Sequence, residues 1–308
     1  MFLQYGGSAM YTIVLHTLTL YEIFAYFFLY SFLGWVSEVA FHAVKTGKFV
    51  NRGFLNGPVC PIYGAGVVLI LLILGEYAQT MWAVFLVGVT VPTLLELVTG
   101  WLLETFFHDK WWDYSERRFN FKGYICLEFA LLWGLAAVFV IGVIHPAVKW
   151  FVTLFSELAG TVLVSAALAA LAADCVVTVL QVVKLNQKLA EIDRIAKALR
   201  AGSDLIGKEV AAVTLAAQKG AEKVKDAVSE KREAWGERAA ERRAKAKARI
   251  DEIVKKMPKR LLRAFPTLSS KKNPDSVPLA RESMEKDGRA GKEDAPAERK
   301  GEKDDPGT

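Results

Sequence analysis

The sequence predicts an all-α integral membrane protein with about five transmembrane helices, a long cytoplasmic helix or coiled coil, and a disordered C-terminal tail. Residues up to about Val183 are apolar with few charges, whereas residues from Lys184 onward are charged almost throughout. Apolar segments of about 20 residues, the length that crosses a hydrocarbon core of about 30 Å, recur along the first part. One residue pattern also occurs twice there, which indicates an internal duplication.

Composition excludes a single soluble core. The 308 residues are 53% hydrophobic with a formal net charge of +6, but these averages combine two chemically different parts. Cys60, Cys126 and Cys175 lie in or beside apolar segments, without the spacing of a zinc site or a disulfide framework. Residues 1–10 contain no Lys or Arg, so we expect no cleaved signal peptide. We also expect no metal, no cofactor and no nucleic-acid partner.

The transmembrane domain is predicted over residues 1–183. Its spans are expected at residues 20–41, 59–78, 81–103, 123–145 and 157–183, and the start of the first span stays open. We expect a turn after His145 and Pro146. Bases follow the first and third spans: Lys45, Lys48, Arg52, Lys110, Arg117, Arg118 and Lys122. Because short cytoplasmic loops carry the excess of Lys and Arg, we expect an external N-terminus and a cytoplasmic C-terminus.

The duplicated pattern defines two helix-loop-helix units, at about residues 20–78 and 81–145. Each has Gly-Trp-x-x-Glu at the end of an apolar run, then Phe, a base and Gly, and then an aromatic-Gly pair. The equivalent positions are Gly34 and Gly100, Glu38 and Glu104, Gly53 and Gly123, and Gly64 and Gly134. The same direction of both units predicts parallel repeats related by an axis along the membrane normal. The alternative is the ordinary enrichment of Trp and Gly near membrane interfaces, which does not fix spacing.

The cytoplasmic part is predicted as two segments. Residues 184–257 have alternating four- and three-residue apolar spacing, beginning at Leu185 and Leu189, which is typical of an amphipathic helix or coiled coil. Such a helix could form a homo-oligomer or dock a partner. In residues 258–308 a basic segment with large apolar groups comes first; it is either a contact for anionic lipid head groups or an ordinary helix end. From Ser269 onward the composition predicts disorder.

The polar residues in and beside the spans are candidates for a cluster that binds substrate, binds an ion or is structural. Charged groups at membrane depth cost free energy, so we expect them to have a role. None is assigned a catalytic role. Arg52 is expected to pair with Glu38 or Glu104 through its planar guanidinium, and Asp113 to cap the loop or pair with Arg52. Asp174 is expected either to bond a neighbouring helix or to act in function. The cluster comprises Glu38, Asn51, Arg52, Asn56, Glu96, Glu104, Asp113, Asn120 and Glu128.

The segment before the second span contains Asn51, Asn56, Gly57, Pro58 and Pro61, which resist regular helix. Irregular backbone at membrane depth is tolerated only where protein buries it or water reaches it. The sequence therefore predicts a broken or re-entrant start to the second span.

These motifs resemble a bacterial membrane family, the ABC-transporter type IV or CmpB-like permeases. The resemblance extends over about residues 20–150 and rests on Tyr30 to Glu38, Asn51 to Gly64, Trp112 to Ser115, and Phe119 with Asn120 and Gly123. It implies a multi-pass permease of the bacterial cell membrane. It also implies a lipid bilayer around the spans and a separate ATPase chain as a possible partner.

A near-match to a phosphate loop, from Gly202 to Gly207 and Lys208, is followed by Glu209 in place of the hydroxyl residue. No strand is expected before it, so we predict no ATPase motif in this chain.

Three functions compete. A transporter of unknown substrate would have a polar site between the repeats near the cytoplasmic face. A membrane-embedded enzyme acting on a lipid or lipid-linked substrate would use the same acids and bases, but a His pair, metal spacing and a nucleophile elbow are missing from the sequence. A scaffold would present the coiled-coil arm.

Overall fold

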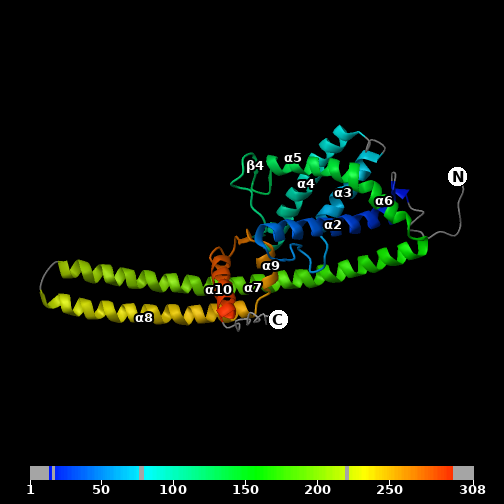
Figure 1. Cartoon of the computed structure of the whole chain (residues 1–308). Helices are drawn as coiled ribbons and strands as arrows, with labels where there is room; N and C mark the ends of the chain where they lie inside the picture. Colours follow the sequence, from blue (N-terminus) through cyan, green and yellow to red (C-terminus); the bar gives the residue numbers. More distant parts are fainter. Residues whose placement is uncertain (1–13, 16–17, 76–79, 219–221, 294–308) are drawn as a thin grey trace, which may run out of the picture. The chain divides into compact units, whose positions relative to one another are not determined.

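A computed structural model describes residues 14–15, 18–75, 80–218 and 222–293 of the chain. The chain forms two compact units, which we describe separately (Figure 1). Unit 1 comprises residues 1–187 and 258–272, and unit 2 comprises residues 188–257 and 273–308. The chain therefore leaves unit 1, builds unit 2, and returns to unit 1 for a short segment, Pro258–Lys272, that we call the returning segment.

Unit 1 begins with a short antiparallel pair, β1 (Val14–Leu15) and β2 (Leu18–Thr19), and then helix α2 (Leu20–Thr46). A capping box starts α2: the Thr19 side chain accepts from the Glu22 backbone N–H, and the Glu22 carboxylate accepts from the Thr19 backbone N–H. Gly47 ends the helix in the left-handed conformation, with φ 67°, which suits a residue without Cβ.

The second predicted span is wrong in length. Helix α3 runs only over Pro61–Leu74, 14 residues, which is about 21 Å of helix and less than the hydrocarbon thickness. It starts at Pro61 because proline fits the first turn, where its missing N–H leaves no bond unmade. Residues 47–60, all of them described, form neither helix nor strand, which confirms the predicted irregular start. Residues 76–79, the end of the predicted span, lie outside the described residues.

The third and fourth predicted spans are long helices. Helix α4 is Met81–Phe107, and α5 (Leu127–Phe139) continues through a π-helix (Val140–Ile144) into α6 (His145–Thr153). The turn expected after His145 and Pro146 lies at residues 154–156, later than the predicted end of the fourth span, because the helical path goes on to Thr153. A π-helix adds one residue to the turn, and Pro146 follows it at the start of α6, where its missing N–H is tolerated.

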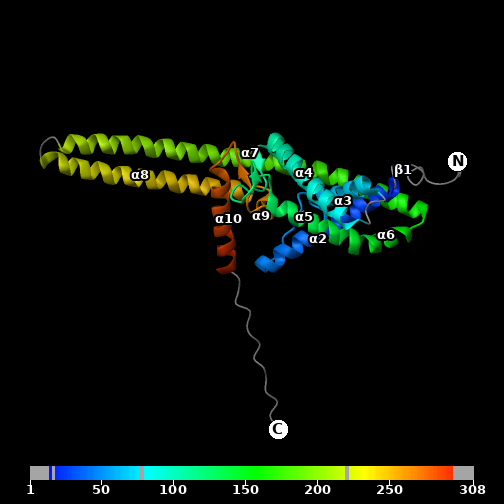
Figure 2. The same ribbon diagram turned by 90° about the horizontal axis from the view of Figure 1, so that it is seen from above.

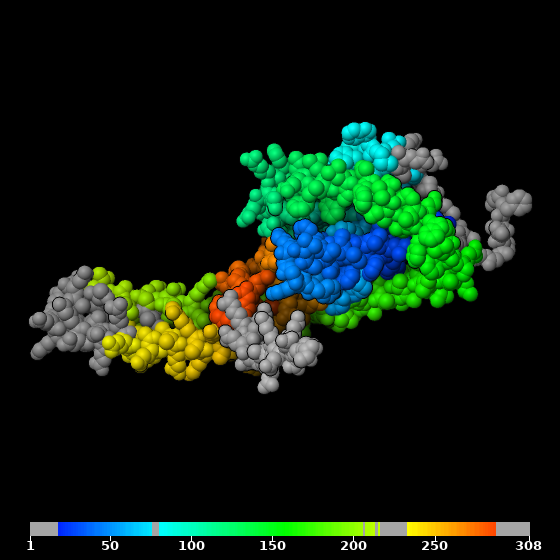
Figure 3. All heavy atoms as spheres, in the orientation of Figure 1, coloured from blue at the N-terminus to red at the C-terminus, as the bar shows by residue number. Residues whose placement is uncertain are grey.

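Helix α7 (Glu157–Gln218) completes the apolar set. Four helical stretches in the described part are long and apolar enough to cross a membrane: Leu20–Thr46, Met81–Phe107, Leu127–Thr153 and Glu157–Ala212. Four of the five predicted spans therefore have a helix of spanning length, and α3 is the exception. Many large apolar side chains on these helices are exposed, among them Phe41, Leu86 and Leu135, as expected for surfaces that face lipid. In Figure 3 the side chains of α2 (blue) form part of the outer face of unit 1.

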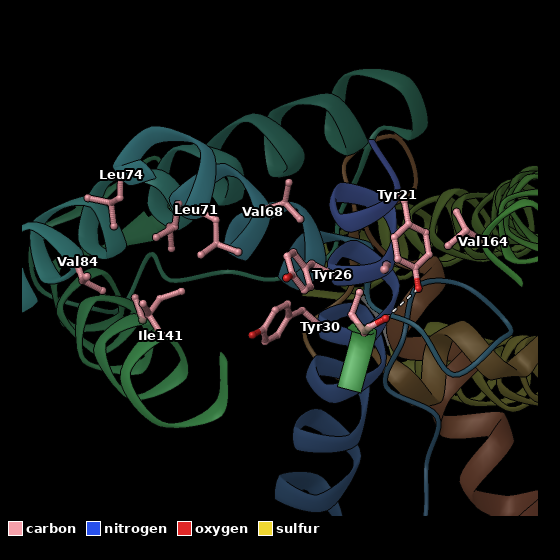
Figure 4. Close-up of a cluster of buried hydrophobic side chains, with 13 residues drawn as sticks. Tyr21, Tyr26, Tyr30, Val68, Leu71, Leu74, Val84, Ile141 and Val164 are labelled. Atoms are coloured by element: carbon pink, nitrogen blue, oxygen red, sulfur yellow. Dashed lines mark hydrogen bonds between the residues drawn. The ribbon is translucent and has the colours of Figure 1, made fainter. Parts of the chain in front are cut away.

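The core of unit 1 gathers side chains from α2, α3, α4, α5, the π-helix, α6 and α7 (Figure 4). Tyr26 and Tyr30 of α2 are buried, and Val84 of α4 is fully buried. The Tyr21 hydroxyl donates to the Val152 carbonyl at 3.4 Å, as the dashed line shows. These contacts join both ends of the predicted transmembrane domain into one core.

Glycines allow close helix packing in both repeat units, but at different heights. In the first, a Cβ at Gly64 would lie 2.2 Å from the Phe27 carbonyl oxygen and 2.3 Å from the Ser31 hydroxyl. In the second, Gly134 packs against Phe85 and Val89 of α4. These two residues lie about two helical turns further from Gly100 along α4 than Phe27 and Ser31 lie from Gly34 along α2. Superposition of the two units stays a prediction.

Short strands and one short helix complete unit 1. In the second loop β4 (Asn120–Phe121) pairs with β5 (Ile125–Cys126), and β3 (Asp109–Lys110) pairs antiparallel with β6 (Ser269–Ser270) of the returning segment. Helix α9 (Lys259–Ala264) precedes β6.

Unit 2 contains the part of α7 after residue 187, helix α8 (Glu222–Lys255) and helix α10 (Ser276–Glu293). Figures 1 and 2 both draw α8 alongside α7 as a helical hairpin, and Arg249 of α8 lies 3.9 Å from Glu191 of α7. Leu189 and Ile192, on the apolar stripe predicted from the sequence, are fully buried. The helix over residues 188–218 and 222–255 is confirmed, whereas a coiled coil with another copy stays a prediction.

The disorder predicted from Ser269 is wrong over residues 269–293, because β6 and α10 lie there. Val277 and Ala280 of α10 are buried, and the Ser283 hydroxyl donates to Asp251 of α8 at 2.5 Å. A highly charged helix is therefore kept in place by a narrow apolar face, which composition alone does not reveal. Residues 294–308 lie outside the described residues.

Candidate functional site

The first loop, residues 47–60 between α2 and α3, is organised by Asn51. Its Oδ1 accepts hydrogen bonds from the Trp35 indole N–H at 2.8 Å and from the Gly53 backbone N–H at 3.0 Å. Its Nδ2 donates to the Asn56 carbonyl at 2.8 Å. An amide side chain carries both donors and an acceptor, so one residue closes this turn against α2.

The far end of the same loop is held by Asp174 of α7. Its Oδ1 accepts from the Asn56 backbone N–H at 3.0 Å and from Asn56 Nδ2 at 2.9 Å, and its Oδ2 accepts from the Gly57 N–H at 2.7 Å. A Cβ at Gly57 would lie only 3.2 Å from Asp174 Oδ2, so glycine permits this approach. Asp174 therefore bonds a loop backbone rather than a Ser or Thr of a neighbouring helix.

Arg52 and Glu38 form the first half of a polar cluster. Arg52 Nε lies 3.7 Å from Glu38 Oε2, and the Tyr63 hydroxyl donates to Glu38 Oε1 at 2.6 Å. Of the two predicted partners of Arg52, Glu38 is confirmed and Glu104 is not in contact with it, but the contact is made through Nε rather than through two parallel bonds of the guanidinium. Arg52 also donates to the Ala264 carbonyl and lies over the Phe265 ring, 5.9 Å from its centroid.

Glu96 of α4 forms the second half. It is 8% exposed and accepts from the Tyr114 hydroxyl at 3.0 Å and from the Trp133 indole N–H at 3.5 Å. The Trp133 ring contacts the Tyr63 ring edge to face, with centroids 5.5 Å apart. Tyr63 and Trp133 are the equivalent aromatic residues of the two predicted repeat units, and their contact joins Glu38 to Glu96 across α2, α3, α5 and α4. We call Glu38, Arg52, Tyr63, Glu96, Tyr114 and Trp133 the inter-repeat cluster.

The other acidic candidates lie elsewhere, so the single predicted cluster is wrong. Glu104 pairs with Lys271 of the returning segment. It lines an open surface cavity of about 580 Å³ together with Lys122 and Lys271. Glu128 lies 3.1 Å from Arg117, and both side chains are more than half exposed. The equivalence of Glu38 with Glu104 therefore does not extend to their partners.

Asp113 and Asn120 stabilise the second loop, residues 108–126, by bonds within that loop. Asp113 lies 2.9 Å from Lys110 Nζ and accepts from the Ser115 N–H at 2.9 Å. Of its two predicted roles, capping the loop is confirmed, whereas pairing with Arg52 is wrong, because its partner is Lys110. Asn120 Nδ2 donates to the Arg117 carbonyl at 2.7 Å. The Ser115 and Lys110 bonds lower the pKa of Asp113 below its usual range, although burial opposes them.

The returning segment contacts both loops, which the sequence did not predict. Arg260 Nη1 donates to the carbonyls of Gly53 at 2.9 Å and Leu55 at 3.0 Å, and its Nη2 donates to the Phe54 carbonyl at 2.6 Å. Burial lowers the pKa of Arg260, and the nearby Asp174 carboxylate opposes that shift. The available signal was the mixture of bases with large apolar residues after Pro258.

Aromatic packing and a strand pair reinforce this contact. Trp111 of the second loop lies between Phe54 and Phe265, with each pair of ring centroids 5.0 Å apart. Leu261 and Leu262 are buried, and β6 extends the edge of β3. The apolar residues near Pro258 thus pack on protein rather than on lipid head groups.

In the described residues no group of three or more His, Cys, Asp or Glu could hold a metal ion. Residues 202–209 lie inside α7, so the near-match to a phosphate loop is helical and lacks the strand-loop-helix context.

Comparison with protein families gives one match, to the family described as "Putative ABC-transporter type IV", over residues 25–179. The chain belongs to this family. The match includes the inter-repeat cluster and Asp174, whereas α8, α10 and the returning segment lie beyond it. Among curated proteins and solved structures the comparisons find no match.

Proposed function

We propose that the chain is the membrane-embedded permease subunit of a transporter, with its polar site at the inter-repeat cluster near the cytoplasmic face. The observation that carries this proposal is the Tyr63–Trp133 contact, which links a carboxylate of each repeat unit in one path. Family membership and the four helices of spanning length support it.

Energetics favour a functional role for Glu96. A carboxylate in the middle of an apolar helix is costly, and such residues mark substrate or proton paths. Glu96 is nearly buried and its two partners, Tyr114 and Trp133, are uncharged. An apolar side chain would serve a purely structural position as well, so the carboxyl group of Glu96 supports a functional role.

The second crossing of the membrane is proposed to combine the first loop with α3. Helix α3 contributes about 21 Å, and an extended chain adds about 3.3 Å per residue, so a few residues of the loop supply the difference. Asn51, Asp174 and Arg260 satisfy the exposed backbone groups of that loop, as a segment at membrane depth requires. Five crossings then keep the N-terminus outside and the C-terminus in the cytoplasm.

Cysteine labelling tests this topology. Cys175 is exposed, so it is first replaced by Ser, and Lys48→Cys or Arg117→Cys is then introduced. Both new thiols should react only after the cells are opened. Labelling of either position from outside intact cells would show that the topology is wrong.

The energy source is proposed to be a separate ATPase chain in the bacterial cell membrane. The helical hairpin of α7 and α8 is a candidate docking element for that chain or for a second copy. Cross-linking of the full chain and of a chain ending at Val183 should differ if the hairpin has this role. Equal cross-linking of the two chains would contradict a docking role for the hairpin.

Matched substitutions test the permease proposal. Glu96→Gln and Glu38→Gln should not restore the metabolite profile of a deletion strain. Glu128→Gln should restore it, because the Glu128 side chain is exposed and its partner is Arg117 of the second loop. Untargeted comparison of metabolites and lipids supplies the readout without a known substrate. Full restoration by both cluster variants would contradict the proposal.

A membrane scaffold is the second candidate, and the α7–α8 hairpin favours it. It predicts that the cluster variants restore the strain while a chain lacking the hairpin does not.

A further inference from the structure

The carbonyl oxygens of Gly53, Phe54 and Leu55 converge on one guanidinium, that of Arg260. From this geometry we propose a binding site for guanidinium-bearing ligands, which the chain's own Arg260 fills in this structure. We call the three carbonyls the carbonyl site. The proposal goes beyond the permease function, because the site lies outside the inter-repeat cluster and its occupancy can be measured without transport.

The carbonyl site is fixed by groups other than Arg260. Asn51 closes the loop from one end, through Gly53 and Asn56. Asp174 closes it from the other end, through the N–H groups of Asn56 and Gly57. A loop held on both sides keeps its carbonyls oriented when the cation leaves, and such preorganisation favours binding of a replacement.

The charge distribution suits a cation. Three carbonyl dipoles point their negative ends at one place. Burial lowers the pKa of Arg260, and the formal negative charge of Asp174 offsets part of that shift. Unwound backbone that presents its carbonyls is a common way to hold cations in membrane proteins.

The donor geometry selects a guanidinium over an ammonium. Nη1 serves two carbonyls and Nη2 serves the third, so the donors come from two atoms of one plane. An ammonium presents its three donors from a single atom, whereas a guanidinium has a fixed planar fork.

Arg260 is an imperfect occupant. Its Nε is buried without a hydrogen-bond partner among the described residues, and an unpaired buried donor costs free energy. The family match covers the first loop and Asp174 but ends before Arg260. The carbonyl site therefore belongs to the family region, and its tethered occupant belongs to the part of the chain outside it.

The test uses the full-length chain in detergent with Arg260→Ala, which empties the carbonyl site. Guanidinium at low millimolar concentration, with ionic strength held constant by sodium chloride, should raise its melting temperature in a saturable way. The apparent affinity should exceed that of the wild type by about tenfold or more, because the wild-type site is filled. Urea, a planar molecule without the charge, should give no saturable rise.

Arg263→Ala is the matched control, since Arg263 lies on the same short helix and is exposed. It should respond to guanidinium as the wild type does. If Arg260→Ala has a lower melting temperature and guanidinium does not raise it, Arg260 only stabilises the fold and the proposal is overturned. If Arg260→Ala does not fold, recovery of folded protein in guanidinium but not in urea supports the site, and failure in both overturns it.

Discussion

The two loops of the repeat units share a sequence pattern and differ in what holds them. The first loop is closed by its own Asn51 and is also fixed by residues far along the chain: Asp174, which bonds Asn56, and Arg260, which bonds Gly53. The second loop is fixed mainly by its own residues, through Lys110, Asp113, Ser115 and Asn120 and through the β4–β5 pair. The two loops therefore share the glycines of the sequence pattern, whereas the contacts that stabilise them differ.

Because of this difference, the shapes of the two loops depend on different parts of the chain. The remote contacts of the first loop can break when Asp174 or Arg260 moves, whereas the bonds within the second loop join its own residues. The first loop also provides Arg52 to the inter-repeat cluster, and the second provides Tyr114. The permease proposal therefore places the movable contact on the Glu38 side of the cluster.

The largest effect on stability is expected from removal of the returning segment. Two truncated chains, ending at Met257 and at Lys272, differ only in that segment and both lack α10. The shorter one loses the Arg260 bonds and the burial of Leu261 and Leu262, which we expect to lower the stability of unit 1 by about 4 kcal/mol or more. Thermal unfolding in detergent measures the difference.

A chain ending at Val183 should likewise insert into the membrane, because the apolar helices remain, but it should be less stable than the full chain. If the chains ending at Met257 and Lys272 melt together, the returning segment does not support the first loop, and the comparison between the loops fails.

The sequence predicts the local part of this architecture well. The apolar helices α2, α4, α5 and the start of α7 follow from composition, and the irregular first loop follows from its Asn, Gly and Pro residues. The Arg52–Glu38 pair was predictable because the two residues lie close along the chain and carry opposite charges.

Contacts across long sequence separation were not predictable in this way. Arg260 meets Gly53 over 207 residues, and nothing in a single sequence indicates which of its many bases would do so. Tyr63, Tyr114 and Trp133 were missed because aromatic residues near interfaces are common, and only packing shows that these three join carboxylates. The short α3 was missed because hydropathy does not mark where a helix ends.

The next largest effect is expected from Asp174→Asn. The carboxylate accepts from two backbone N–H groups and the Asn56 side chain, and an amide would turn an NH₂ group toward one of these donors. Charged hydrogen bonds of this kind contribute about 1.5–3 kcal/mol each, so we expect a loss of about 3 kcal/mol. Thermal unfolding checks it, with Asp204→Asn as a control on the same long helix. A loss equal to that of the control would show that the loop does not depend on Asp174.

Arg52→Lys should have a smaller effect. Arg52 is 22% exposed and Glu38 is 32% exposed, so solvent weakens their attraction. Lysine keeps the charge but loses the planar fork that reaches both Glu38 and the Ala264 carbonyl. We expect a loss of about 1 kcal/mol together with incomplete restoration of the deletion strain. A variant that melts like the wild type and restores the strain fully would mean that Arg52 serves only as a topological charge.

The smallest effect is expected from Asp113→Asn in the second loop, the local counterpart of Asp174. Its side chain is 38% exposed and is held by Lys110 and Ser115, so we expect a loss of about 1 kcal/mol or less at neutral pH.

Because its folded-state pKa is lowered, the contribution of Asp113 is fully present above the ordinary pKa of an aspartate. It is lost as the pH falls through the lowered value, where both states of the chain bind the proton. Melting temperatures of the variant and the wild type should therefore differ at neutral pH and converge in acid. A loss as large as that of Asp174→Asn would show that the second loop depends on its carboxylate as strongly as the first, and the proposed difference between the loops would be wrong.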